Sequence, residues 1–128
     1  MKLFHWFLRN KSIREIPPMP SWETTVEMLY DKHLDAFSGE ILRVIYSKDK
    51  SMRYVILKNE NGLLTYQLEA IYLFDEETWE YIQLSKSAKD KLPAMWEPYR
   101  GILETSFFEQ ERDLLRALEA EPEYKQYF

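Results

Sequence analysis

The middle of the chain alternates hydrophobic and polar residues with the period of two that is typical of β-strands. Segments 41–47, 52–58 and 62–74 show this pattern and are rich in β-branched and aromatic residues. The third segment has the clearest polarity: one face holds Leu64, Tyr66, Leu68, Ala70, Tyr72 and Phe74, and the other holds Thr65, Gln67 and Glu69. Glu69 is expected to be a surface residue on the polar face of this strand.

A fourth strand is predicted over residues 77–85, where aromatic side chains again alternate with polar ones. The connections between these segments are short. Asn61-Gly62 is a strong hairpin signal between the second and third segments, and the acidic run 75–77 is expected to turn the chain into the fourth. Because short connections join antiparallel neighbours, the four segments are expected to form an antiparallel β-meander.

A helix is predicted on each side of these strands. Ser21 is a suitable N-cap for a helix that runs to about Phe37. One side of this helix would carry a mainly apolar stripe, formed by Trp22, Val26, Leu29, His33 and Phe37. Ser106 and Glu109 have the spacing of a capping box, which begins a helix to about Ala120, and Pro122 stops it. The expected fold is an α+β domain, with the N-terminal and the C-terminal helix packed on one face of the four-stranded antiparallel meander.

The chain divides into a basic segment with a proline-rich linker, residues 1–20, and a single α+β domain, residues 21–128. Residues 1–9 have apolar side chains at helical spacing, and the prolines of 17–20 predict a stiff connection. Packing of residues 1–9 on the domain is favoured over weak contact with a membrane interface. No signal peptide or membrane-spanning stretch is evident, so a cytoplasmic protein is expected.

The charge of the chain is uneven. Residues 1–20 hold four basic side chains and one acidic side chain, whereas residues 21–128 hold 13 basic and 21 acidic side chains. This acidic domain disfavours nucleic acid and favours a basic protein partner. The chain has no cysteine, which removes disulfides and thiolate chemistry and fits a reducing compartment.

The sequence offers little material for catalysis. His5 and His33 are the only imidazoles, and His33 is expected to be a half-buried residue of its helix rather than a base. Glycine-rich phosphate loops are absent, and the acidic residues lack the spacing of a calcium loop. The chain is therefore interpreted as non-enzymatic, with no catalytic residues, no metal and no cofactor.

The best candidate for binding is the segment 94–100, because tryptophan, tyrosine, methionine and arginine are enriched where proteins bind one another. The candidate partner-binding residues are Met95, Trp96, Glu97, Tyr99 and Arg100, together with the acidic residues Asp75, Glu76 and Glu77. For Trp96, a place in the hydrophobic core is slightly favoured over a place in an interface. For Tyr99 and Arg100, binding is favoured.

The C-terminal half carries an order of motifs that resembles small uncharacterised bacterial proteins. The motifs are Met-Trp-Glu-Pro at 95–98, Gly101, Ser-Phe-Phe-Glu at 106–109 and Glu-Pro-Glu-Tyr-Lys at 121–125. Some of these proteins look like immunity proteins of contact-dependent or polymorphic toxin systems. The resemblance implies a small, acidic, non-enzymatic protein that neutralises a basic toxin domain by occluding it.

Two functions remain open from the sequence. The first is a protein-binding domain, most concretely an immunity-type inhibitor of a cationic partner. The alternative is a small-molecule-binding domain or small enzyme, whose aromatic cavity is lined by Tyr46, Tyr54, Tyr66 and Tyr72. A filled core with an exposed acidic and aromatic patch would favour the first function, and a deep pocket with convergent polar groups would favour the second. The identity of the partner and the oligomeric state stay open.

Overall fold

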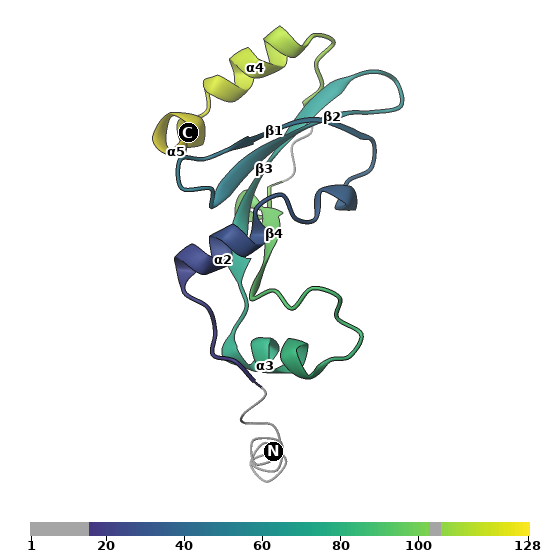
Figure 1. Ribbon diagram of the computed structural model, residues 1–128. Helices are drawn as coiled ribbons and strands as arrows, with labels where there is room; N and C mark the ends of the chain where they lie inside the picture. The colour runs from purple at the N-terminus through teal and green to yellow at the C-terminus, as the bar shows by residue number, and fades with distance from the viewer. Residues whose placement is uncertain (1–15, 103–105) are drawn as a thin grey trace.

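The computed structural model describes residues 16–102 and 106–128, so the expected helix at residues 1–9 lies outside the described residues. Figure 1 shows the sheet at the centre, α4 and α5 at one end of it, and α3 beyond the other end. The strands are β1 (Glu40–Tyr46), β2 (Met52–Lys58), β3 (Leu64–Leu73) and β4 (Ala94–Pro98). The helices are α2 (Trp22–Leu29), α3 (Glu76–Leu84), α4 (Glu111–Glu119) and α5 (Pro122–Tyr127), with short 3-10 turns η1 (Leu34–Ala36) and η2 (Tyr99–Gly101).

The four strands form one antiparallel sheet in the order β1-β2-β3-β4, with helices before and after it. This confirms the predicted α+β class and the four-stranded antiparallel sheet. The expected hairpin between β2 and β3 is present. Its turn closes because the side chain of Asn59 accepts hydrogen bonds from the backbone of Asn61 and Leu63, and Gly62 adopts a positive φ of 80°.

The two terminal helices lie on opposite faces of the sheet, so their predicted packing on one face is wrong. Tyr54 of β2 contacts the residues of α4, whereas its neighbour Arg53 points to the side where α2 packs. Neighbouring residues of a strand point to opposite faces. We call these two sides the α4 face and the α2 face.

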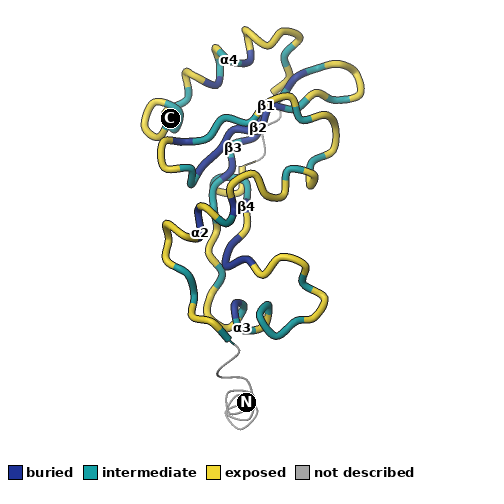
Figure 2. The backbone as a smooth tube through the Cα atoms, in the orientation of Figure 1, coloured by how far each residue is buried: buried dark blue, intermediate teal, exposed yellow. Residues whose placement is uncertain are grey.

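The core on the α4 face is aromatic and aliphatic. Leu114 and Leu118 of α4 are fully buried against β2 and β3, and the ring of Tyr54 packs on those of Tyr66 and Phe128. The high hydrophobic periodicity of α4 places both leucines on the side that meets the sheet. In Figure 2 the buried residues run along β2 and β3, while the outer side of α4 is exposed.

The core on the α2 face is smaller and includes a charge. Leu29 of α2 packs with Leu92, Ala94 and Trp96 around β4. Above them lies Arg53, whose side chain is fully buried. A buried cation of this kind requires a compensating partner, and the structure supplies one on β3.

That partner is Glu69, which the sequence pattern had placed on a polar surface. The Nε of Arg53 donates to the Oε1 of Glu69 at 2.8 Å, and Glu69 is only 6% exposed. A second donor, Nη1 of Arg53, bonds the carbonyl oxygen of Lys32 at 3.0 Å. The alternation of β3 was correct, but its polar residues face a second core layer instead of solvent.

The predicted fourth strand at 77–85 is wrong, because residues 76–84 form the helix α3. Asp75 caps this helix by accepting a hydrogen bond from the backbone N–H of Thr78 at 2.7 Å, and Glu76 and Glu77 lie in the first turn. Trp79 is the buried residue of the helix, and its indole donates to the carbonyl oxygen of Pro17. Asp75, Glu76 and Glu77 are typical of a helix N-terminus, but the alternation of aromatic and polar residues in 77–85 led to the prediction of a strand.

The fourth strand is instead β4, within the segment 94–100 that was predicted to bind a partner. Pro93 precedes it and Pro98 ends it. Strand β4 lies at the edge of the sheet and pairs only with β3. Prolines are tolerated on an edge strand because the N–H groups they lack are not needed for hydrogen bonds to a second neighbouring strand.

The predicted helix from Ser21 begins as expected but ends early. The Ser21 side chain accepts from the N–H of Thr24, and the helix ends at Leu29 instead of near Phe37. His33 has a left-handed φ of 60° and is exposed, so its predicted place on a helical stripe is also wrong. The chain leaves the helix because Asp31 and Lys32 are bonded to the sheet by Tyr46 and Arg53.

The helix predicted to begin at the capping box of Ser106 and Glu109 begins later, at Glu111. Phe108 instead exchanges two backbone hydrogen bonds with Leu64, both 2.8 Å long, and so extends the sheet by one bridge. Helix α4 starts only after this bridge, with Gln110 as its N-cap. Helix α4 ends at Glu119, close to the predicted end near Ala120, and Pro122 is the first residue of a further helix, α5.

We expect Gly39→Ala to destabilise the domain more than Gly62→Ala does. Both glycines have positive φ, which costs an alanine about 1–2 kcal/mol. At Gly39 an added Cβ would also lie 2.8 Å from the carbonyl oxygen of Lys58, whereas at Gly62 it would meet nothing closer than 4.0 Å. Urea unfolding followed by tryptophan fluorescence measures the difference. Equal losses of stability would show that the close approach of β1 and β2 relaxes.

We expect Arg53→Met to reduce the free energy of unfolding by about 3–5 kcal/mol, because it leaves the buried carboxylate of Glu69 without its cation. The matched control is Arg43→Met, which removes an exposed pair with Glu111 and should cost about 1 kcal/mol or less. Urea unfolding compares the two. A loss for Arg53→Met no larger than that for Arg43→Met would contradict the role of the buried pair.

Candidate binding site

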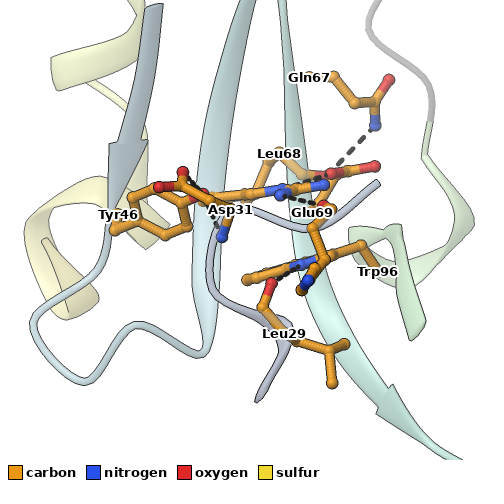
Figure 3. Close-up of polar contacts among 9 residues, drawn as sticks. Leu29, Asp31, Tyr46, Gln67, Leu68, Glu69 and Trp96 are labelled. Atoms are coloured by element: carbon orange, nitrogen blue, oxygen red, sulfur yellow. Dashed lines mark hydrogen bonds and ion pairs between the residues drawn. The ribbon is translucent and has the colours of Figure 1, made fainter. Parts of the chain in front are cut away.

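Trp96 of the predicted binding segment lies in the core of the α2 face. Its indole Nε1 donates to the carbonyl oxygen of Leu29 at 3.0 Å, as Figure 3 shows. The guanidinium of Arg53 lies 4.1 Å from the centre of its ring, and only 6% of the residue is exposed. This contact anchors β4 to α2, and it leaves the indole little surface for a partner.

Met95 and Glu97 point the opposite way, to the α4 face. Met95 is paired across the strands with Tyr72, and Glu97 with Ala70. Met95 is 40% exposed and Tyr72 is 56% exposed. We call these four residues the open strip, since α4 and α5 cover the other part of this face, along β2 and the first half of β3.

Tyr99 and Arg100 lie where the chain leaves the edge of β3. Arg100 and Gly101 both have positive φ, 53° and 69°, and this turn ends the pairing of β4. The chain returns to β3 at Phe108. The pairing along this edge of β3 is therefore interrupted beside Tyr66 and Leu68.

A small pocket lies at this interruption. It has a volume of about 180 Å³. Its walls come from β3, from the turn after β4 and from the start of α5, and the lining residues are Tyr66, Leu68, Tyr99, Ile102, Glu121, Pro122 and Glu123. The lining combines aromatic and aliphatic surface with two carboxylates.

Glu121 is held in place by two tyrosines. The hydroxyl of Tyr54 donates to its Oε1 at 2.8 Å, and the hydroxyl of Tyr66 donates to its Oε2 at 2.7 Å. Hydrogen bonds to an ionised acceptor are short and strong, so the carboxylate has a defined orientation. Burial, and next the hydrogen bond to Glu121, raise the pKa of Tyr54 well above its ordinary value of 10.0.

The pocket is acidic and has no partner cation within the described ranges 16–102 and 106–128. The ion pairs found there join other residues, and none includes Glu121 or Glu123. The guanidinium of Arg100 lies 5.1 Å from the ring centre of Tyr99, a residue of the pocket wall. Two carboxylates beside aromatic rings favour a cationic group.

The acidic candidates Asp75, Glu76 and Glu77 are not part of this pocket. They form the cap and first turn of α3, which follows the far end of β3 (Figure 1). The hydrogen bonds from the backbone and the hydroxyl of Thr78 lower the pKa of Asp75. Their proximity to the helix N-terminus gives them a structural role, and binding by them remains a prediction.

The four tyrosines proposed to line one cavity do not come together. Tyr54, Tyr66 and Tyr72 lie on the α4 face, but Tyr46 lies on the α2 face, where it donates to Asp31 at 2.8 Å (Figure 3). Only Tyr66 among them lines the pocket. Within the part of the chain that the structure describes, no group of His, Cys, Asp and Glu has the arrangement of a metal site.

The sequence did not single out Glu121, Glu123 or Ile102. Glu121 and Glu123 belong to the motif at 121–125 that carried the resemblance to bacterial proteins, but neither was predicted to bind a partner. Their signal was weak, because the tyrosines that orient Glu121 are 67 and 55 positions away along the chain. Tyr99 is the one candidate residue from segment 94–100 that lines the pocket.

We expect Tyr54→Phe to reduce stability at neutral pH by about 1–3 kcal/mol, because it removes a hydrogen bond to a carboxylate. The folded protein has the higher pKa at this phenol, so its contribution is complete below pH 10.0 and is lost as the pH rises above that value. The difference between wild type and Tyr54→Phe should therefore shrink at alkaline pH.

Urea unfolding at about pH 8 and about pH 11 measures this difference on both sides of the ordinary tyrosine pKa. The control is Tyr81→Phe, at a residue that is 73% exposed. A stability difference for Tyr54→Phe that grows at the higher pH would contradict the assignment.

No helix of the described residues is long and apolar enough to cross a membrane.

Comparisons with known proteins identified no relative of this chain. No protein-family model, curated protein or solved structure matches the chain. The resemblance of residues 95–98, 101, 106–109 and 121–125 to immunity-like bacterial proteins thus stays a prediction from sequence. The case for a function rests on the open strip and the pocket beside it.

Proposed function

We propose that this chain is a non-enzymatic domain that binds a basic protein through its α4 face. The contact surface is the open strip together with the adjoining pocket. The observation that carries the proposal is the exposed Tyr72–Met95 pair, which joins β3 to the edge strand β4 and is not covered by α4 or α5. Tyrosine and methionine are enriched in protein interfaces, so their exposure on this part of the sheet favours a docked partner.

Electrostatics supports a basic partner. Residues 21–128 carry eight more acidic than basic side chains. On the contact surface itself, Glu97 belongs to the open strip and Glu121 and Glu123 line the pocket. Complementary charge accelerates encounter with a basic protein and disfavours acidic ones.

The mechanism that fits this surface is occlusion. The site offers aromatic contact area and fixed carboxylates, and it requires no chemical step. An immunity-type inhibitor that covers the active surface of a cationic toxin domain would work in this way. That specific role rests on the resemblance of residues 95–98, 101, 106–109 and 121–125 to such proteins.

The alternative of a small-molecule-binding domain or small enzyme is less well supported. Pockets for small molecules usually enclose about 300–1,000 Å³. The pocket beside Glu121 has about 180 Å³, and Tyr54 and Ile56 are fully buried in a filled core next to it. A volume of this size suits one side chain of a partner better than an independent ligand.

We expect the double substitution Tyr72→Ser and Met95→Ser to weaken partner binding at least tenfold, on the order of the effect of losing an interface hot spot. Thermal stability should change little, since both side chains are exposed. The matched control is Leu42→Ser on β1, at a residue that is 42% exposed. Each variant is immobilised and used to capture proteins from lysate of the native producer, at low and at high salt.

The proposal requires one basic protein that wild type and Leu42→Ser retain, that the double variant loses, and that high salt releases. A captured protein that all variants retain equally would remove the open strip from the interface. An acidic partner would contradict the electrostatic argument.

A further inference from the structure

We infer that the pocket formed by Tyr66, Tyr99, Glu121 and Glu123 is a binding site for an arginine side chain. This inference rests on the proposed function, since the arginine belongs to the basic partner that docks on the α4 face. It goes further by naming the group that is recognised and the residues that recognise it. The geometry of the carboxylates and the rings supports it in three ways.

First, Glu121 has unused capacity for hydrogen bonds on both of its oxygens. Each oxygen of an ionised carboxylate can accept about two hydrogen bonds, and one at each is taken by a tyrosine hydroxyl. The remaining acceptor positions suit the paired N–H groups of a guanidinium, which binds carboxylates in a fork. The two tyrosines hold the carboxylate in a fixed orientation, which lowers the entropy cost of that binding.

Second, the pocket wall combines surfaces that match the two parts of an arginine side chain. Leu68, Ile102 and Pro122 supply aliphatic contact for the methylene stem. Tyr66 and Tyr99 supply aromatic surface in the same wall as the carboxylates. Guanidinium groups stack on aromatic rings because they are planar and weakly hydrated.

Third, the chain already uses guanidinium–ring contacts, one on the opposite α2 face and one on the pocket wall. Arg53 lies over the ring of Trp96, and Arg100 lies over the ring of Tyr99 on the pocket wall. Lysine in place of arginine would lose both the stacking and the forked hydrogen bonds. The site is therefore expected to discriminate between the two cations.

The test uses small amides as probes, because they separate the pocket from the rest of the interface. The full chain is titrated with N-acetyl-arginine methylamide and followed by two-dimensional NMR. The lysine analogue and the citrulline analogue, which is neutral and close to arginine in shape, are titrated in parallel. Arginine should shift the resonances of Tyr66, Tyr99 and Ile102, and bind at least about tenfold more tightly than citrulline because of its charge.

Glu123→Gln is the principal variant. The hydroxyls of Tyr54 and Tyr66 bond Glu121, so a substitution at Glu123 should disturb the fold less. It should weaken arginine binding severalfold with an unchanged melting temperature. Glu121→Gln should weaken binding more strongly, and its folding is checked by the NMR spectrum. The control is Glu60→Gln in the exposed turn between β2 and β3, which should leave binding unchanged.

Several results would overturn the inference. These are equal binding of arginine and citrulline, equal binding of arginine and lysine, or an affinity that Glu123→Gln does not change. Binding that appears only after Arg9 and Arg14 are changed to Gln would assign the pocket to the basic N-terminal segment of the chain itself.

The proposed function is judged separately. If the arginine amide does not bind but the Tyr72 and Met95 substitutions abolish partner capture, only the pocket inference fails. If partner capture does not depend on Tyr72 and Met95, the proposed function fails whatever the amide does.

Discussion

The buried cation of Arg53 is the constraint around which the α2 face is organised. Removing a guanidinium from water is costly, and the cost is offset only if its donors and its ring faces find partners. Here Nε, Nη1 and the guanidinium face find partners on three segments: Glu69 on β3, the carbonyl of Lys32 after α2, and the ring of Trp96 on β4. Buried Nη2 has no hydrogen-bond partner among the described residues. One side chain thus connects a helix end, a central strand and an edge strand.

This connection explains two irregular features. The end of α2 is set at Leu29 because the following residues bond to the sheet through Arg53 and Tyr46. The short strand β4 is retained at the edge of the sheet because Trp96 inserts between Arg53 and the carbonyl of Leu29. After this anchor the chain turns away at Arg100, and the small acidic pocket occupies the interruption.

The same arrangement leaves the other face of β4 open. Because Trp96 faces inward on the α2 face, its neighbours Met95 and Glu97 must face the α4 face, where α4 and α5 cover only part of the sheet. Binding by segment 94–100 stays a prediction from composition, but the structure shows where its residues lie. Segment 94–100 does reach the surface with Met95 and the pocket with Tyr99, but its most prominent aromatic residue is a core residue.

Local periodicity by itself determined the α+β class, the strands β1, β2 and β3, the polarity of β3 and the hairpin at Gly62, because each depends on residues close together in the chain. Residues 76–84 carried a local helix signal in the cap at Asp75, which the alternation concealed. Only the tertiary structure decided that Glu69 is buried. It also decided that Glu121 meets Tyr54. The physical reason is distance along the chain: the partners that settle these environments lie 16 to 67 residues away, and a local pattern does not record them.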